Sequence, residues 1–469
     1  MALTDSENVQ RSRMRVFAAA QRARLRTWLA DGSDRSLAQR TAGAAFLIRV
    51  ASAGLLYLSQ VVLARWMGSF EFGVYVYVWT WVLLIGTLAD FGLAIAAQRF
   101  IPEYAERKAF ELLRGFLTGS RWLVLAIATV MAALAALGVT LIAPRLDHYL
   151  VVPLYLACLS LPFYTLTSML DGIARSYNWV NLALVPPYIG RPLVLIGVMA
   201  AFHLAGLPAD AVSAMIAAVI ATWVNAIVQL VMLERRLRTN VESGPKAYAI
   251  RTWFQTAIPI FMVGSFYLLL TYADVLVLQQ FRPPDEVAVY YAAAKTLALV
   301  AFVNFSVAAA ATHKFSEYHV AGDRERLSAF LADAIRWTFW PSLAATIVIL
   351  LLGRPFLWLF GPNFVDGYSL MFILAVGLLS RATVGPVERL LNMLGEQRAC
   401  ALVYALAFAA NLVLCVILIP RFGATGAAIA TSCAVVAESI MLFFVTKRRL
   451  GLHVLVWGRP RSPAGSAGL

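Results

Sequence analysis

Seven basic side chains lie inside long apolar stretches of the sequence or at their edges. They are Arg49, Arg121, Arg191, Lys295, Arg336, Arg381 and Arg389. An arginine guanidinium presents a planar fork of donors that fits phosphate oxygens, and a lysine ammonium offers a point charge to the same group. Positive charge set within apolar sequence therefore indicates the binding of an anionic group.

The depth of these cations within the apolar stretches separates them. Arg49 and Lys295 lie deepest, and Arg191 and Arg381 are intermediate; the other three lie near ends, where a long side chain reaches the interface at little cost. A charge at the centre of a bilayer costs about 2.5–3.5 kcal/mol on insertion scales. The four deeper cations must therefore face the protein interior or water. They are the predicted substrate-binding residues, and ion pairing with acids is the alternative explanation for each.

Acidic residues are fewer in these stretches. Asp90, Asp274, Glu388 and Glu438 lie within them, and any of these carboxylates can serve to neutralise an arginine. Asp274 lies deep in the seventh stretch, where an ionisable carboxylate can bind a proton or Na⁺. It is the candidate for ion coupling.

The elements that position these residues are apolar helices. The chain has 469 residues, of which 61% are hydrophobic and 14% charged, with a mean hydropathy of +0.75; soluble domains carry about 25% charged residues. A helix needs about 20 apolar residues to cross a bilayer. We predict an all-α polytopic membrane protein with about twelve such helices. They cover residues 42–64, 73–97, 118–143, 149–170, 182–204, 211–233, 254–280, 287–311, 333–352, 367–391, 400–419 and 424–446.

Several kinds of chemistry have no support in the sequence. It contains no phosphate-binding loop of the G-x-x-x-x-G-K-[ST] type and no H-E-x-x-H motif. The five histidines are scattered near predicted helix ends, and the four cysteines form no C-x-x-C pair. No predicted loop is long enough for a soluble catalytic domain. We therefore predict no catalytic residue, no metal site and no cofactor.

The distribution of Lys and Arg predicts the orientation. With twelve spans, 27 of the 39 basic residues fall on the side of the two termini, 5 on the other side and 7 within spans. Basic residues are enriched on the cytoplasmic side of membrane proteins, so both termini are predicted to be cytoplasmic. The net charge of +14 then reflects topology, and no nucleic-acid partner is expected.

The chain also repeats itself at a shift of about 215 residues. Residues 71–75 (EFGVY) correspond to 286–290 (EVAVY), and 235–237 (RRL) correspond to 448–450 (RRL). Two six-helix bundles that enter from the same side form a parallel repeat with a cleft between them. The predicted parts are a basic tail (1–41), a first bundle (42–238), a linker (239–253), a second bundle (254–450) and a cytoplasmic tail (451–469). The first tail is predicted to be either an amphipathic interfacial helix or disordered.

Particular motifs connect the chain with a known family. Residues 63–75 (LARWMGSFEFGVY), 88–93 (LADFGL), 391–398 (LNMLGEQR) and 419–431 (IPRFGATGAAIAT) resemble those of the polysaccharide transporters. These belong to the multidrug/oligosaccharidyl-lipid/polysaccharide (MOP) flippase superfamily, whose two six-helix bundles are MATE-like. The resemblance covers about residues 42–450.

The resemblance implies a flippase rather than an enzyme. Such proteins move a polyprenyl-diphosphate-linked oligosaccharide across the bacterial inner membrane by alternating access, among membrane lipids and other polysaccharide-export proteins. Relatives carry cations in helices one and eight, which Arg49 and Lys295 match, and a carboxylate in helix seven that couples transport to Na⁺ or H⁺, which Asp274 matches. The alternatives are a multidrug or cation antiporter of the same superfamily, a membrane glycan polymerase or ligase, and a structural partner in polysaccharide export.

Overall fold

The structure, a computed structural model, describes residues 34–452, 454 and 456. The chain divides into two compact units, Met1–Ala51 and Ser52–Leu469. The predicted basic tail up to residue 33, and the predicted C-terminal tail from residue 457, lie outside the described residues. Residues 34–51 are helical, and every contact discussed below lies within the second unit.

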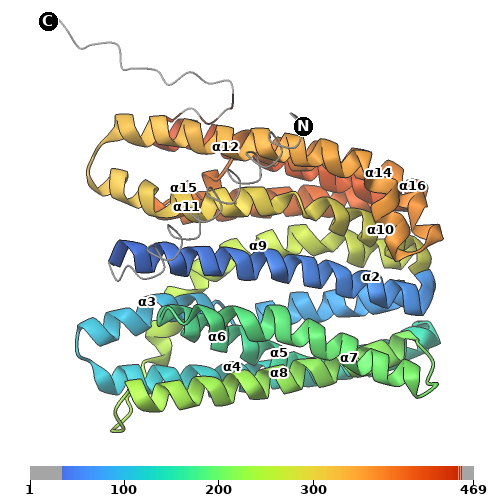
Figure 1. Cartoon of the computed structure of the whole chain (residues 1–469), viewed down its shortest axis with the longest axis horizontal. Helices are drawn as coiled ribbons and strands as arrows, with labels where there is room; N and C mark the ends of the chain where they lie inside the picture. The colour runs from blue at the N-terminus through green and yellow to red at the C-terminus, as the bar shows by residue number, and fades with distance from the viewer. Residues whose placement is uncertain (1–33, 453, 455, 457–469) are drawn as a thin grey trace, which may run out of the picture. The chain divides into compact units, whose positions relative to one another are not determined.

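The described residues form helices and contain no strand, so the prediction of an all-α chain is confirmed (Figure 1). The helices are α2 (Asp34–Leu88), α3 (Leu93–Glu106), α4 (Phe110–Ile142), η1 (Ala143–Arg145), α5 (His148–Ser176), α6 (Val180–Val185), η2 (Pro186–Gly190), α7 (Arg191–Leu204), α8 (Ala211–Asn240), α9 (Ile250–Phe281), α10 (Pro284–Ala298), α11 (Ala301–Val320), α12 (Arg324–Leu351), α13 (Gly353–Phe360), η3 (Pro362–Gly367), α14 (Tyr368–Val384), α15 (Val387–Met393) and α16 (Gln397–Leu450).

Many of these helices can cross a membrane. In the described part of the chain, nine are long and apolar enough, or ten if a bent pair counts as one span. Two of them, Val50–Glu106 and Gln397–Leu450, have 57 and 54 residues, more than twice the ~20 that one span needs. Each contains a glycine with a non-helical backbone, Gly68 (φ 78°) and Gly423 (φ 58°). The prediction of a multi-pass membrane protein is confirmed, and twelve spans remains a prediction.

Two glycines near the first turn have different roles. Gly68 has the positive φ that L-residues rarely adopt, and Figure 1 shows the chain reversing direction within α2. Gly73 is helical, and a Cβ there would lie 1.9 Å from the Pro284 carbonyl oxygen. Gly73 therefore lets the backbone of α2 approach the start of α10.

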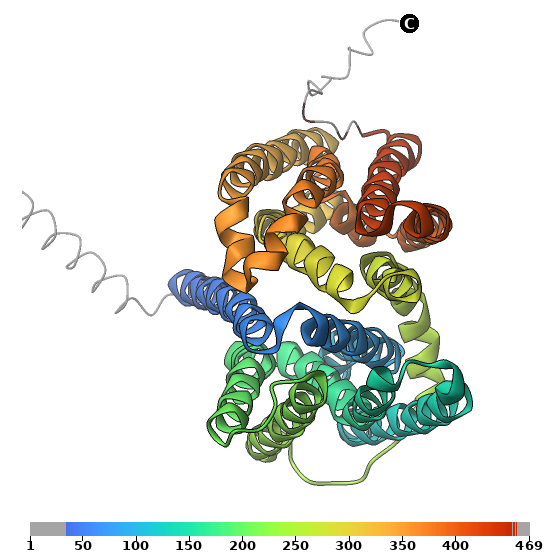
Figure 2. The ribbon, with the colours of Figure 1, turned by 90° about the vertical axis from the view of Figure 1, so that its right-hand side faces the viewer.

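The helices of the second unit pack in two sets on either side of the α8–α9 linker. In the first set α5 packs against α4 and α8, and α7 packs against α8; in the second, α16 packs against α9 and α14, and α11 against α12. Figure 2 looks along the helices and shows the first set in blue and green below the second set in yellow to red.

The internal repeat of the sequence reappears as a repeated contact. A carboxylate oxygen of Glu71 accepts a hydrogen bond from the backbone N–H of Ala211 at 2.8 Å, and Glu286 accepts one from Ala424 at 2.5 Å. Ala211 begins α8, and Ala424 follows the break at Gly423. Each glutamate thus places negative charge at a helix N-terminus, where it is favourable.

Four helices that the sequence predicts as continuous are interrupted. One is 287–311, which breaks at residues 299–300 between α10 and α11. The stretch 73–97 breaks at residues 89–92, where the Asp90 carboxylate accepts a bond from the Gly92 N–H at 2.7 Å. The stretch 182–204 contains the π-helical turn Pro186–Gly190, and 367–391 breaks at Gly385 (φ 61°). Positive φ at glycine and missing proline N–H groups explain the other three breaks.

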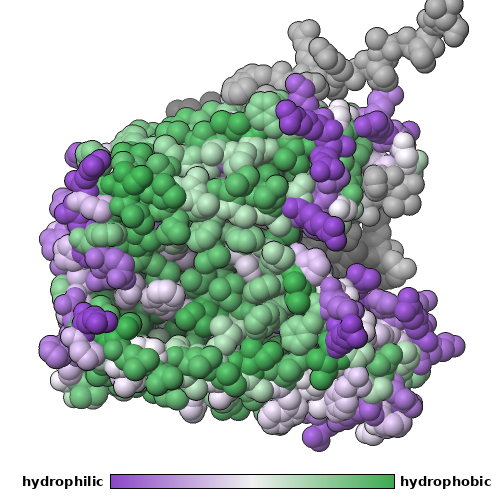
Figure 3. Space-filling model, turned by 180° about the vertical axis from the view of Figure 1, so that it is seen from behind, coloured by the Kyte–Doolittle hydropathy of each residue, from purple (hydrophilic) through white to green (hydrophobic). Residues whose placement is uncertain are grey.

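The surface is that of a membrane protein. Figure 3 shows a broad band of hydrophobic residues with hydrophilic residues at both of its ends. At the C-terminal end, Leu452, Val454 and Val456 are buried in the same apolar cluster as residues of α11, α12 and α16. The chain therefore continues to pack after α16 ends.

Candidate functional site

A cavity of about 430 Å³ lies in the second unit and contains two of the predicted cations, Arg191 and Lys295. This volume lies in the range of about 300–1,000 Å³ that is usual for ligand sites. The lining side chains come from α2, α5, η2, α7, α8, α9 and α10. The cavity is thus built from both helix sets.

Arg191 reaches the cavity directly after the π-helical turn. Its backbone N–H donates to the Pro186 carbonyl, which closes that turn. Its guanidinium carbon lies 5.1 Å from the ring centre of Trp79 and 5.6 Å from that of Tyr164. Cation–π contacts of this length are favourable, the more so where water is excluded. Two aromatic rings therefore hold the charge and leave its donors available.

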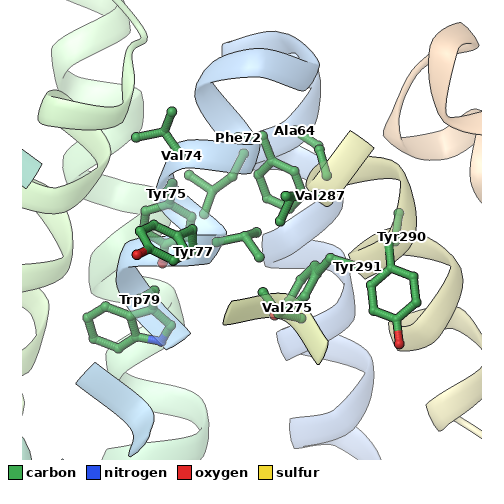
Figure 4. Close-up of a cluster of buried hydrophobic side chains, with 14 of the residues drawn as sticks. Ala64, Phe72, Val74, Tyr75, Tyr77, Trp79, Val275, Val287, Tyr290 and Tyr291 are labelled. Carbon is green, nitrogen blue, oxygen red and sulfur yellow. The ribbon is translucent and has the colours of Figure 1, made fainter. Parts of the chain in front are cut away.

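Lys295 lies near the C-terminal end of α10 and has the same kind of surroundings. Its ammonium nitrogen is 5.0 Å from the ring centre of Tyr291 and 5.9 Å from that of Tyr272. Figure 4 shows Tyr291 on the same side of α10 as Trp79 of α2. The two cations are therefore set in one wall of aromatic rings contributed by both halves.

The cavity carries an excess of positive charge. Within the described part of the chain, neither Arg191 nor Lys295 forms an ion pair with a carboxylate. Asp171 also lines the cavity, but its carboxylate lies 2.8 Å from the guanidinium of Arg175. An anionic ligand would supply the partner that the two cations lack.

One group of contacts between the two helix sets lies near the Gly68 turn. Arg65 donates to the carbonyls of Leu359 (2.7 Å) and Trp358 (2.6 Å), and Ser69 donates to Asp285. These bonds lie at the end of the helices where Gly73 meets Pro284. They hold the two sets together at that end.

Arg381 occupies a different place. Its guanidinium forms a 2.5 Å ion pair with Glu438, whose side chain is 1% exposed. It also lies over the ring of Tyr267 at 5.4 Å. Neither Arg381 nor Glu438 lines the cavity, so the structure does not bring Arg381 together with Arg191 and Lys295.

Asp274 is buried in α9 beside the cavity wall. Its carboxylate accepts hydrogen bonds from the Tyr290 hydroxyl, from the Thr431 hydroxyl at 3.0 Å and from the Val275 N–H at 2.8 Å. Figure 4 shows Tyr290 turned away from Trp79, and Asp274 does not line the cavity. The predicted coupling residue thus has its own polar site.

Two further sequence predictions concern Arg49 and the expected absence of a metal site. Arg49 lies in α2, but its side chain is outside the described residues. Among the described side chains, no three of His, Cys, Asp or Glu gather to form a candidate metal centre. The aromatic residues around the cations were not predicted from the sequence. Tyr164 and Tyr272 lie away from the ends of the apolar stretches 149–170 and 254–280. They were the available signal, because tyrosines concentrate at membrane interfaces.

Comparison with known proteins now identifies the fold family. The sequence profile described as "Polysaccharide biosynthesis protein" matches residues 39–319, more than half of the chain. The chain belongs to this family. A second profile, MatE, matches residues 259–417. The chain is therefore a membrane transporter of the MOP flippase superfamily, as the sequence motifs predicted.

Individual relatives agree with this assignment. The probable low-salt glycan biosynthesis flippase Agl15 of Haloferax volcanii is 21% identical over 406 residues, which is 84% of this chain and 80% of the relative. An inward-facing multidrug resistance MATE transporter of the MOP superfamily has a TM-score of 0.72 at 15% identity, covering 87% of this chain and 98% of its own. The lipid II flippase MurJ in an inward closed conformation has a TM-score of 0.69 at 18% identity, with 86% and 87% covered. These relatives are transporters or flippases rather than enzymes.

Proposed function

We propose that this protein moves an oligosaccharide linked to a polyprenyl diphosphate from one leaflet of the membrane to the other. The observation that carries the proposal is the pair Arg191 and Lys295 in one cavity between the two helix sets, without carboxylate partners in the described part of the chain. The similarity to Agl15, a probable glycan biosynthesis flippase, supports a glycan as cargo.

The cavity suits both parts of such a substrate. Arginine binds phosphate oxygens through two parallel bonds and lysine through a single charge, so both Arg191 and Lys295 suit the charge of a diphosphate. Tyr57, Gln60 and Ser168 also line the cavity and offer groups that hydrogen-bond sugar hydroxyls. The sugar head passes through the cavity while the lipid tail remains in the bilayer. Arg49 and Arg381 remain proposed contacts for other stages of transport.

The proposed topology has twelve spans and cytoplasmic termini in a bacterial inner membrane. Two long apolar segments each divide at a glycine, Gly68 and Gly423, and a bent pair of helices forms one more span. The excess of basic residues on the side of the termini supports the orientation. The contacts of Arg65 and Ser69 then lie on the outer side, and they must open for release during alternating access.

Asp274 is the proposed coupling residue. A buried carboxylate in a membrane helix is a candidate for binding a proton or Na⁺, and Asp274 already accepts bonds from two hydroxyls and a backbone N–H. We assign the protein no cofactor. Membrane lipids and other polysaccharide-export proteins are its proposed partners.

The second candidate function is the export of drugs or cations, as in MATE transporters. The MatE profile match and the MATE structures favour it. A cationic substrate requires acids in the cavity, whereas this cavity holds two cations without a carboxylate partner among the described residues. The charge of the cavity therefore favours an anionic substrate. A polymerase or ligase is less consistent with relatives that are transporters.

The test is deletion of the gene, followed by measurement of the lipid-linked glycans that accumulate in the cytoplasmic leaflet. We expect one species to accumulate, and the wild-type gene to clear it. The variants Arg191→Gln, Lys295→Gln and Arg49→Gln should fail to clear it at normal protein levels. The matched control is Arg121→Gln, because Arg121 pairs with Glu234 at 2.9 Å and does not line the cavity.

Each outcome decides something. If no lipid-linked glycan accumulates, the proposed substrate is wrong and efflux of drugs becomes the function to measure. If the glycan accumulates and both Arg191→Gln and Lys295→Gln clear it fully, the function holds and the assigned site is wrong.

A further inference from the structure

The helix that carries Arg191 is broken by two consecutive prolines. Pro186 and Pro187 have no N–H, so the carbonyls four residues earlier, those of Leu182 and Ala183, lose their normal helical donors. The turn Pro186–Gly190 is π-helical, and the N–H of Arg191 closes it on the Pro186 carbonyl. Single π-helical turns often occur at functional sites. Here the turn ends at the residue that enters the cavity.

A side chain of the neighbouring helix replaces one of the missing donors. The Gln229 side-chain amide donates to the Leu182 carbonyl at 3.2 Å, the carbonyl that Pro186 leaves without a helical partner. Gln229 is completely buried. Its bond therefore compensates for the proline inside the protein, where water does not reach.

Gln229 belongs to a polar stripe on α8. Thr222, Asn225 and Gln229 follow one another at spacings of three and then four residues, which places them on one face of the helix. Thr222 and Asn225 are both at least nine-tenths buried. A Cβ added to Gly190 would lie 3.4 Å from the Asn225 side-chain oxygen, so this amide lies against the last residue of the π-helical turn. The polar stripe follows the break from its beginning to its end.

Buried polar groups are costly in a membrane helix. Atoms of all three side chains, the Thr222 hydroxyl, the Asn225 amide nitrogen and the Gln229 amide oxygen, have no partner within the described residues. If the neighbouring helix were unbroken, apolar side chains could pack against it without this cost. We therefore attribute the polar residues of α8 to the broken segment Pro186–Gly190 that they face.

We propose that Gln229, supported by Asn225, is a positioning residue that holds the π-helical turn so that Arg191 points into the cavity beside the rings of Trp79 and Tyr164. An α-helix turns about 100° per residue. Replacing the π-helical turn with α-helix would therefore rotate Arg191 away from the cavity. This inference rests on the proposed function only for its effect on transport, because the direction of residue 191 can be measured without any substrate.

The experiment measures the reactivity of a cysteine at position 191. Arg191→Cys is made in a Cys433→Ala background, because Cys433 is exposed whereas Cys158, Cys400 and Cys415 are buried. The probe is a negatively charged methanethiosulfonate reagent, added to the protein in lipid nanodiscs. We expect Gln229→Leu to lower the labelling rate at position 191 by about fivefold or more, since misplacement by about 1 Å has large effects on reaction rates.

The matched control is Thr222→Val, on the same face of α8 but without a bond to the broken helix in the described part of the chain. It should leave the labelling rate unchanged. Lys295→Cys reports on the other side of the cavity, and Gln229→Leu should leave its rate unchanged. Equal labelling of Arg191→Cys with and without Gln229→Leu would overturn the proposal, whatever happens to transport.

A second variant covers failure of Gln229→Leu to fold. The double variant Pro186→Ala/Pro187→Ala leaves α8 untouched and restores both missing N–H groups, so that residue 186 competes with Gln229 for the Leu182 carbonyl. We expect the same fall in labelling at position 191, because the π-helical turn reverts to α-helix. An unchanged rate in this double variant would also overturn the proposal. If both variants lower the rate while the deletion strain accumulates no lipid-linked glycan, the positioning role holds and the proposed substrate fails.

Discussion

Two arginines that look alike in the sequence have opposite surroundings in the structure. Arg381 lies 2.5 Å from Glu438, a carboxylate that is almost completely buried. Arg191 lies beside the rings of Trp79 and Tyr164 and, among the described residues, has no carboxylate partner. Both side chains are placed within the apolar part of the protein. They differ in the group beside the guanidinium, which is a carboxylate for Arg381 and aromatic rings for Arg191.

This difference distinguishes an arginine with a structural role from one that is available to bind a ligand. A cation with its own carboxylate is electrically complete, and a ligand anion would have to compete with that carboxylate. A cation held only by aromatic faces keeps its hydrogen-bond donors for a ligand. The Arg381–Glu438 pair therefore balances its own charge within the second helix set, and the cavity of Arg191 and Lys295 is the site that we propose binds an anion.

The largest expected effect is on stability, from breaking the Arg381–Glu438 pair. Removing one partner of a buried pair leaves an uncompensated charge, which costs about 3–5 kcal/mol. We expect Arg381→Met and Glu438→Leu, each alone, to lower the free energy of unfolding by this amount. Combining both changes should recover most of the loss, because apolar residues can replace a buried pair. Chemical unfolding in a fixed detergent gives the three values.

An exposed ion pair gives the control for this measurement. Arg336 and Asp333 form a pair in which the two side chains are 44% and 51% exposed, and such pairs contribute about 0–1 kcal/mol. Arg336→Gln should therefore change stability little. Two small single effects at Arg381 and Glu438, with no recovery in the double variant, would show that the pair is not structural.

The next effect is on transport, from the two cations of the cavity. Hydrogen bonds to charged groups contribute about 1.5–3 kcal/mol each, so Arg191→Gln and Lys295→Gln should each lower transport by about 10- to 100-fold. Stability should fall less than in Arg381→Met, since cation–π contacts of about 0.5–2 kcal/mol are lost but no ion pair with a described residue. The measurement is the flipping of a lipid diphosphate in proteoliposomes, normalised to folded protein.

The opposite results would exchange the roles that we assign to Arg191 and to the Arg381–Glu438 pair. Loss of stability in Arg191→Gln, together with normal transport per folded molecule, would make Arg191 the structural residue. Loss of transport in the stable Arg381→Met/Glu438→Leu double variant would move the substrate site into the second helix set.

The sequence could predict the elements but not this distinction. Hydropathy locates the spans, and the repeat of Glu71 and Glu286 anticipates two similar halves, because these properties are local or periodic. The partner of Arg381 lies 57 residues away along the chain, and nothing in one sequence shows which acid meets which base. The π-helical turn was missed for a related reason: Pro186 signals a break, but the donor that stabilises it comes from Gln229 on another helix.

A smaller effect is expected on the ligand-dependent stability of the protein. A ligand at ten times its dissociation constant stabilises the folded state by about 1.4 kcal/mol. Inorganic pyrophosphate should therefore raise the melting temperature of the wild type and of the Arg381→Met/Glu438→Leu variant. It should fail to do so for the Arg191→Gln/Lys295→Gln double variant. A rise that survives in this last protein would place the anion elsewhere.

The smallest effect should come from the rings that hold Lys295. A cation–π contact contributes about 0.5–2 kcal/mol, so Tyr291→Leu should lower transport by a few-fold, less than loss of the charge itself. Tyr291→Phe is the matched control, because it keeps the ring 5.0 Å from the ammonium and removes only the hydroxyl. Equal transport by the Leu and Phe variants would mean that the aromatic face does not hold Lys295. A loss in the Phe variant as well would mean that the hydroxyl itself contacts the substrate, which would make the cavity wall part of the binding site rather than a support for its charge.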